Sequence, residues 1–271
     1  MQILFLGDIV GKPGRRAVRE FLSRLRGRRD VDLVVANGEN AAGGTGVTAP
    51  VVREIFDAGV DVLTGGNHIW DKREGLSLVR EEERILRPAN IPPGADGRGW
   101  GIFPGKSGTP YAVVSLLGRV FLGNWDCPFR WMDEALPEMK RTAAAVLVDF
   151  HAEATSEKRA MAFYLDGKVS AIAGTHTHVQ TVDAQILEGG TGYITDVGMC
   201  GPVRSVIGMN PDEVLGRFLS QLPARFEVAA GEAEVAGVFF DIDPEAGGCR
   251  DLLSFRMTES QMRSEDAWKR F

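Results

Sequence analysis

The chain has 271 residues, of which 44% are hydrophobic and 25% are charged, as is typical of globular proteins. Its formal charge of -6 argues against broad binding to long nucleic acids, because such binding depends on many lysines and arginines that neutralise phosphates. A small anionic substrate is compatible with this charge.

The amino-terminal segment, Met1–Gly7, has a short apolar run and no basic residue. It resembles neither a signal peptide nor a membrane span, so we expect a cytoplasmic protein with no membrane partner. Cys127, Cys200 and Cys249 are widely spaced and form no Cys-x-x-Cys pair, which favours free thiols. No linker or internal repeat interrupts the sequence, and we expect a single domain over residues 1–271.

Short apolar runs rich in β-branched residues are predicted as strands, and polar residues follow each of them. Five such runs occupy residues 3–6, 31–36, 60–63, 146–150 and 169–173. Apolar residues at helical spacing predict helices between them, near residues 18–25, 48–56, 134–145 and 156–165. This alternation predicts an α/β core with a site at the carboxyl ends of its strands.

Three regions depart from the alternation. Residues 88–110 are rich in glycine and proline and are expected to form a long loop near the core. Residues 196–208 follow a predicted strand and are expected to form another long loop, compatible with a wall of the site. The apolar runs at 235–243 and 252–257 predict antiparallel strands added to a sheet.

The polar residues after the strands include a set of nitrogen and oxygen donors that hard metal ions prefer. The set is Asp8, Glu39, Asn40, Asn67, His151, His176 and His178. It is too large for one ion but suits two ions, about 3.5 to 4 Å apart, that share a bridging carboxylate and act on a phosphate. His68 is left over to donate a proton to a leaving oxygen. If the strand before His176 continues in extended form, His176 and His178 point to the same side.

The ordered motifs of this chain resemble those of the calcineurin-like metallophosphoesterases over roughly residues 3–200. These motifs are Gly7-Asp8, Gly66-Asn67-His68, His151 and Gly174-x-His176-x-His178. Two positions depart from that superfamily, because Val10 replaces a usual histidine and Glu39 replaces a usual aspartate. Asn40 is placed to substitute for the histidine. This variant, with the segments 65–71 and 195–202, is similar to the bacterial YmdB-like 2',3'-cyclic-nucleotide 2'-phosphodiesterases.

The resemblance implies a four-layer α-β-β-α sandwich of two mixed sheets with helices outside. It also implies two metal ions, iron or manganese, bridged by Glu39. The implied ligands are Asp8, Asn40 and His178 for one ion, and Asn67, His151 and His176 for the other. His68 is implied as the general acid when a metal-bridging hydroxide attacks a 2',3'-cyclic nucleotide and yields a 3'-nucleotide. A small phosphodiester is therefore the expected partner, and a homo-oligomer is compatible with the sequence.

Several candidates also have an ordinary structural interpretation. His151 is compatible with a buried structural histidine, and Asp8 and Asn40 are compatible with turns. Asp71, three residues after His68, either orients that ring or is an exposed charge. Cys200 could border the site, although no histidine is left to act as the base for a thiol.

Two alternative functions are also compatible with the motifs. One is a broader phosphodiesterase or phosphomonoesterase activity, because metal ions supply phosphoryl chemistry and the surrounding loops choose the ester. The other is a regulatory protein that binds a phosphate ligand with little turnover. A proton donor at His68 would have no role in such a protein.

Overall fold

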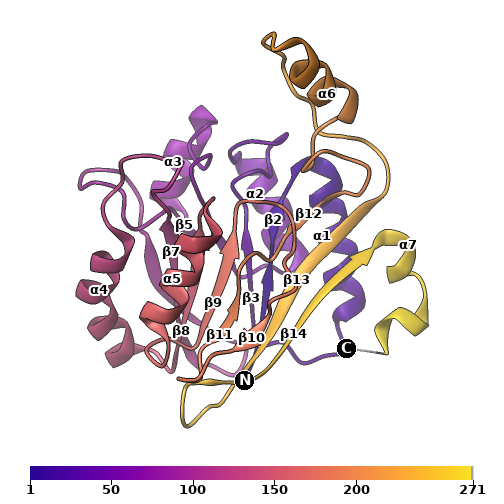
Figure 1. Ribbon diagram of the computed structural model, residues 1–271. Coiled ribbons are helices and arrows are strands. Elements are labelled where there is room, and N and C mark those ends of the chain that lie inside the picture. Colours follow the sequence, from indigo (N-terminus) through magenta and orange to yellow (C-terminus); the bar gives the residue numbers. More distant parts are fainter. Residues whose placement is uncertain (270) are drawn as a thin grey trace.

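Alternate residues of the first strand point into two different cores. In β1 (Gln2–Leu6), Ile3 and Phe5 pack between two sheets, whereas Leu4 and Leu6 pack against helices outside the first sheet. The same alternation recurs in neighbouring strands and produces a layered molecule (Figure 1). The structure is a computed structural model that describes residues 1–269 and 271.

The first sheet is mixed and has eight strands in the order β2-β12-β13-β1-β3-β4-β5, with β14 paired to β13. Besides β1, its strands are β2 (Asp8–Ile9), β3 (Leu33–Asn37), β4 (Val62–Thr64), β5 (Ile85–Leu86), β12 (Met199–Pro202), β13 (Ala233–Ile242) and β14 (Cys249–Thr258). Strands β1, β3, β4 and β5 are parallel. The antiparallel pair of β13 and β14 confirms the two strands expected near the carboxyl end.

The second sheet is also mixed and has six strands in the order β10-β11-β9-β8-β7-β6. They are β6 (Trp100–Pro104), β7 (Pro110–Leu117), β8 (Ala145–His151), β9 (Ala171–Thr175), β10 (Gln185–Ile186) and β11 (Gly192–Ile194). The central strands β7, β8, β9 and β11 are parallel, and the edge strands β6 and β10 are antiparallel to their neighbours. The central strands are buried, which explains their nearly continuous apolar sequences.

Helices cover the outer face of each sheet. The first sheet packs against α1 (Gly11–Leu25) and α2 (Ala49–Ala58), and the second packs against α4 (Pro128–Thr142) and α5 (Thr155–Leu165). Other helices are α3 (Arg73–Glu81), α7 (Glu259–Met262) and the 3-10 helix η1 (Glu265–Trp268). Three apolar cores separate the layers, so the expected four-layer sandwich of two mixed sheets is confirmed.

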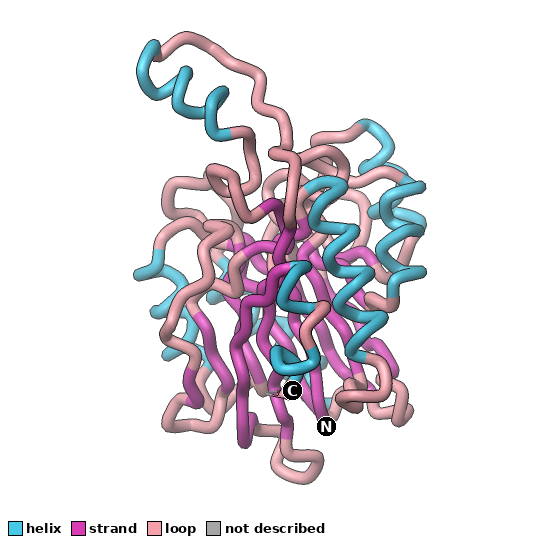
Figure 2. Tube along the Cα trace, turned by 90° about the vertical axis from the view of Figure 1, so that its right-hand side faces the viewer, coloured by secondary structure: helices cyan, strands magenta, loops and turns pink. Residues whose placement is uncertain are grey.

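Helix α6 (Pro211–Ser220) stands apart from the layers on an arm (Figures 1 and 2). Its Leu215, Phe218 and Leu219 are exposed. This helix was not among the predicted elements, although Asn210 caps it through Asp212 N and Pro211 occupies the first turn.

Three predicted boundaries were wrong. Residues 88–110 contain the edge strand β6, and residues 196–208 contain β12, so neither segment is entirely loop. The helix expected at 134–145 begins earlier, at Pro128, and ends at Thr142. Ala145 belongs to β8, because backbone pairing with Tyr111 overrides the helix propensity of an alanine run.

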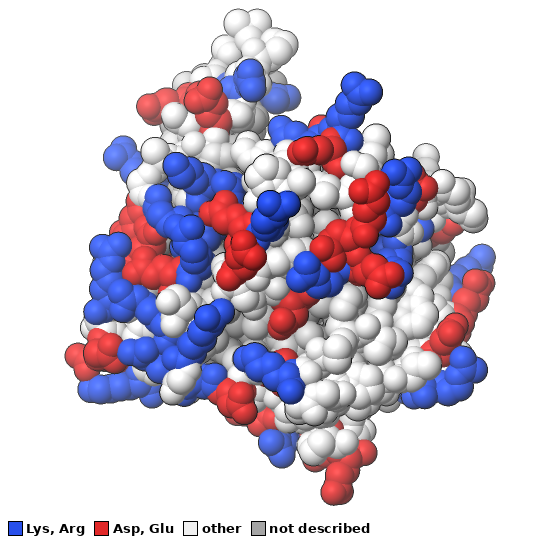
Figure 3. All heavy atoms as spheres, turned by 180° about the vertical axis from the view of Figure 1, so that it is seen from behind, with Lys and Arg blue, Asp and Glu red and all other residues white. Residues whose placement is uncertain are grey.

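The surface is mixed in charge on the face opposite to that of Figure 1. Lysines and arginines are interspersed there with aspartates and glutamates (Figure 3). Among the described residues, no helix combines the length and apolar character that crossing a membrane requires.

Candidate metal centre

Strands from both sheets deliver the predicted donors to one edge of the molecule. Asp8 follows β1, and Glu39 and Asn40 follow β3 in the first sheet. His151 is the last residue of β8, and His176 and His178 follow β9 in the second sheet. Asn67 and His68 follow β4. The structure therefore brings together all eight predicted site residues from five strand ends.

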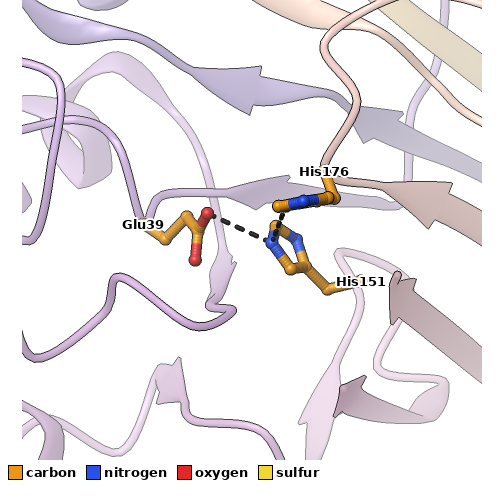
Figure 4. A group of neighbouring side chains, drawn as sticks. All are labelled: Glu39, His151 and His176. Atoms are coloured by element: carbon orange, nitrogen blue, oxygen red, sulfur yellow. Dashed lines mark hydrogen bonds and ion pairs between the residues drawn. The ribbon is translucent and has the colours of Figure 1, made fainter. Parts of the chain in front are cut away.

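His151 is the centre of one group of donors. Its Nε2 lies 3.1 Å from Glu39 Oε1 and 3.0 Å from His176 Nδ1 (Figure 4). The same atom lies 3.2 Å from Asn67 Oδ1. One ring nitrogen cannot satisfy three such atoms with a single proton. Ligands about 2.1 Å from one ion, at right angles, lie about 3 Å apart, so the spacing fits a cation between them.

Hydrogen bonds on the far side of each ring determine which nitrogen faces the site. His151 Nδ1 donates to Thr175 Oγ1 over 2.9 Å, and this hydroxyl donates to Asp149 Oδ1 over 2.6 Å. His178 Nδ1 donates to the carbonyl oxygen of Ile207 over 2.8 Å. In the neutral form of each ring, Nδ1 therefore carries the proton and Nε2 is the atom that can bind a metal, an arrangement typical of metal-binding histidines.

A second group of donors surrounds His178. Its Nε2 lies 3.1 Å from Asn40 Nδ2 and 3.8 Å from Asp8 Oδ1. Rotation of the amide by 180° would place its carbonyl oxygen toward the ring, as a metal requires. Asp8 Oδ1 is buried and has no hydrogen-bond partner in the described part of the chain. An unpartnered buried carboxylate oxygen is costly, and a bound cation would satisfy it.

Glu39 lies between the two groups. Its Oε1 is 3.1 Å from His151 Nε2 and 3.3 Å from Asn40 Nδ2. Its Oε2 accepts a hydrogen bond from the backbone nitrogen of His68 over 2.9 Å. The carboxylate is therefore within reach of both donor groups, as a bridging ligand would be.

In the absence of a metal, the carboxylates of the site stabilise a proton on His151. Burial opposes protonation of His151, but the carboxylates of Glu39 and Asp8 outweigh it and raise its pKa to about 9. Burial would raise the pKa of Glu39, yet the charge of His151 prevails and lowers it to about 2. Burial, aided by His151, lowers the pKa of His176 to about 4. A metal that binds His151 must therefore displace its proton.

Comparison with known proteins identifies the chain. The family model described as "YmdB-like protein" matches residues 4–254. The chain belongs to this family.

Its relatives cover nearly the whole chain. A Bacillus subtilis (strain 168) protein named "2',3'-cyclic-nucleotide 2'-phosphodiesterase" is 44% identical over 90% of this chain and 92% of its own length. The crystal structure of a hypothetical protein from Thermus thermophilus has a TM-score of 0.90 at 43% identity, covering 96% of this chain and 100% of that one. A "novel phosphatase" from Mycoplasma pneumoniae has a TM-score of 0.89 at 35% identity, covering 95% of this chain and 93% of that one.

Residues 176–178, which we call the histidine loop, are not in the extended conformation considered above for this YmdB-like chain. Strand β9 ends at Thr175, and His176 and His178 have positive φ angles of 104° and 65°. Instead of projecting together from a strand, His176 contacts His151 and His178 contacts Asn40. The two rings therefore enter different donor groups.

His68 lies beside the donors and not among them. Its Nδ1 is 2.8 Å from Asp71 Oδ2, and both side chains are 40% exposed. This contact confirms that Asp71 is placed to orient the ring. His68, Glu39 and His178 line a cleft of about 380 Å³. Nε2 of His68, on the side of the ring away from Asp71, is the atom available to a bound ligand.

Two acidic residues at the site were missed from sequence. Asp149 is buried, and it accepts hydrogen bonds from Thr175 and from Asn37 Nδ2 over 2.6 and 3.0 Å. Glu153 Oε2 lies 3.1 Å from His176 Nε2, so it fixes the orientation of that ring. A carboxylate two residues before a histidine in an otherwise apolar strand was the available signal for Asp149.

Close packing explains the glycine at position 66. A Cβ at Gly66 would lie 2.4 Å from His151 Nε2 and 2.5 Å from Glu39 Oε2, so only glycine allows the loop after β4 to approach the donors.

Cys200 does not border the cleft as considered above, because it is buried in the outer core of the first sheet. Burial also raises the pKa of its thiol, which disfavours a reactive thiolate.

Proposed function

We propose that this protein is a dinuclear metal phosphodiesterase that hydrolyses 2',3'-cyclic nucleotides to 3'-nucleotides. The observation that carries the proposal is the position of His68, which lines the same cleft as the donors and has Asp71 on its far nitrogen. The name of the Bacillus subtilis relative supports the choice of substrate. The convergent donors support the choice of chemistry.

In the proposed centre, Glu39 bridges two ions. The ligands of one would be Asp8, Asn40 and His178, and those of the other would be Asn67, His151 and His176. When bound, two such ions neutralise the charge of a phosphate and lower the pKa of a water to about 7. Iron and manganese both suit nitrogen and oxygen donors of this kind, and we propose one of them as the native metal.

Side chains of the protein donate the proton that the leaving oxygen requires. Water attacks phosphorus in line with the bond to O2', this bond breaks, and His68 Nε2 donates a proton to O2'. The attacking water loses a proton to solvent, and His68 later regains one. Asp71 accepts a hydrogen bond from Nδ1 and directs Nε2 toward the cleft. The product is a 3'-phosphate monoester with a free 2'-hydroxyl.

A broader activity on phosphate esters is the second candidate. The solved Mycoplasma pneumoniae structure is named a phosphatase, which favours monoesters as additional substrates. We favour an enzyme over a regulatory binding protein without turnover, because the pairing of His68 with Asp71 suits a proton donor, for which a pure binding protein has no need.

Two alanine variants test the proposal. His68→Ala should retain both metals, measured by inductively coupled plasma mass spectrometry, and lose about 10²- to 10⁴-fold in kcat on 2',3'-cyclic AMP. Glu39→Ala should lose metal as well as turnover. Equal loss of metal from both variants would show that His68 is a ligand. Assays with bis(4-nitrophenyl) phosphate and 4-nitrophenyl phosphate separate the narrow activity from the broader one.

A further inference from the structure

The lining of the cleft beside the donors is of two chemical kinds. Site residues such as Glu39 and His68 form its polar part. Three apolar residues, Ile207, Met209 and Phe226, also line it, and we call them the apolar wall. If the phosphate of a ligand lies among the donors, the rest of the ligand would therefore contact the apolar wall.

The apolar wall is held in place by backbone hydrogen bonds at the base of the α6 arm (Figure 2). Asn210 N donates to Glu227 O over 2.8 Å, and Ala229 N donates to Gly208 O over 3.0 Å. These bonds join the segment before α6 to the segment after it. The wall is thus a two-stranded support and not a free loop, so it can present a fixed surface to a ligand.

Ile207 has an unusual conformation that the site itself maintains. Its φ angle is 47°, which β-branched residues rarely adopt, and its side chain is 52% exposed. Its carbonyl oxygen accepts the hydrogen bond from His178 Nδ1. The same residue therefore orients a proposed metal ligand through its backbone and lines the cleft with its side chain. Strained residues of this kind concentrate at functional sites.

Phe226 supplies the aromatic part of the wall. The guanidinium of Arg217, on α6, lies 5.5 Å from the centre of its ring, within the range of a cation–π contact. The wall residues also line a second hollow of about 440 Å³ under α6, together with Val214 and Phe218. Apolar surface thus continues from the cleft toward the arm.

We propose that the apolar wall binds the base of a nucleotide substrate, with Phe226 and Ile207 as specificity-determining residues. This inference rests on the proposed function, because it assumes a phosphate ester bound at the donors. A base has two flat apolar faces and is linked through the ribose to the reacting phosphate. It therefore matches a wall of aromatic and aliphatic side chains next to a phosphate site.

The test compares two cyclic esters that differ in the base. The substrates are 2',3'-cyclic AMP and glycerol 1,2-cyclic phosphate, which has the same five-membered phosphate ring and no base. Phe226→Ala should raise KM for cyclic AMP about 5- to 150-fold, the usual effect of losing one base–aromatic stack, with little change in kcat. KM for the glycerol ester should hardly change. Ile207→Gly, which removes the side chain and suits a positive φ, should act in the same direction.

Phe163→Ala is the matched control. Phe163 lies on α5, is 63% exposed and is absent from the residues that line the cleft, so its removal should change neither KM. Equal changes of KM for both esters in Phe226→Ala, or no change for either, would overturn the base subsite and leave the proposed function standing. The base subsite is likewise overturned if Phe226→Ala breaks up an oligomer, detected by light scattering, and loses activity on both esters. A wild-type protein that hydrolyses neither ester in the presence of manganese or iron would overturn both proposals.

Discussion

Replacement of Lys158 by methionine should both destabilise the protein and weaken metal binding at the proposed centre. Lys158 on α5 and Asp196 form a buried ion pair, with Nζ 2.6 Å from Oδ2 and each side chain 1% exposed. Asp196 Oδ2 also accepts a hydrogen bond from the backbone nitrogen of Thr177 over 3.0 Å. Thr177 separates His176 from His178, so the ion pair holds the loop in its left-handed conformation.

The size of the effect follows from burial. Removing one partner of a buried ion pair costs about 3 to 5 kcal/mol, because the other charge is left without its counter-ion. In a protein of this size each kcal/mol lowers Tm by about 2 to 4 °C, so Lys158→Met should lower Tm by about 6 to 20 °C. Loss of an interaction that positions metal ligands typically reduces metal affinity about 10- to 100-fold, and we expect the same here.

Calorimetry on the metal-free protein and titration with Mn²⁺ measure the two effects separately. Lys269→Met is the control, because Lys269 and Asp266 also lie 2.6 Å apart but are 78% and 82% exposed. An exposed pair contributes at most about 1 kcal/mol, so this variant should change Tm little. Lys158→Met/Asp196→Asn, which removes both charges, should recover part of the stability.

Equal shifts in Tm for the two single variants would refute the reasoning from burial. Normal Mn²⁺ affinity in a destabilised Lys158→Met would show that the ion pair does not hold the histidine loop.

Three further predictions concern the site. Gly66→Ala should abolish metal binding while leaving the far-ultraviolet circular dichroism unchanged, because the added methyl group collides with His151 and Glu39; a fully metallated variant would contradict this. Because the pKa of His151 is raised to about 9 in the metal-free protein, its proton competes with the metal at pH 7. Apparent Mn²⁺ affinity should therefore rise about tenfold per pH unit up to pH 9, and calorimetry in two buffers should detect about one proton released per bound centre. Asp71→Asn should lower kcat about 10- to 100-fold without loss of metal, and an unchanged kcat would remove Asp71 from the mechanism.

The sequence predicted the site better than it predicted the boundaries of the fold. Asp8 and Glu39 could be placed together because the carboxyl ends of parallel strands meet at one edge of a sheet, whatever the order of the strands. His151 lies in the other sheet, and its place in the site was implied by the family resemblance. Strand β6 was missed because three of its five residues are exposed or partly exposed and it contains glycine and proline. Strand β12 has only four residues, Met199–Pro202, and no alternation that would distinguish it from a loop.

Contacts between distant segments could not be predicted from local patterns. Asp149 and Glu153 reach the histidines only because β8 lies beside β9, and pairing between strands is not visible in either sequence alone. The left-handed backbone of His176 and His178 has the same origin. Positive φ angles are uncommon for any residue with a side chain, and here Asp196, from a later segment, accepts a hydrogen bond from Thr177 between the two histidines.

The valine at position 10 and the asparagine at position 40 belong to one packing arrangement. Val10, where a histidine is usual, is fully buried, and a Cβ at Gly208 would lie 2.7 Å from its Cγ1. The loop that contains Gly208 therefore rests directly on Val10, and it is the loop whose Ile207 carbonyl orients His178. A larger polar ring at position 10 would displace this loop and, with it, the hydrogen bond to His178. Asn40, on a separate loop, places its amide beside His178 without occupying that space, so the exchange of one side chain for another lets the apolar wall approach the proposed metal centre.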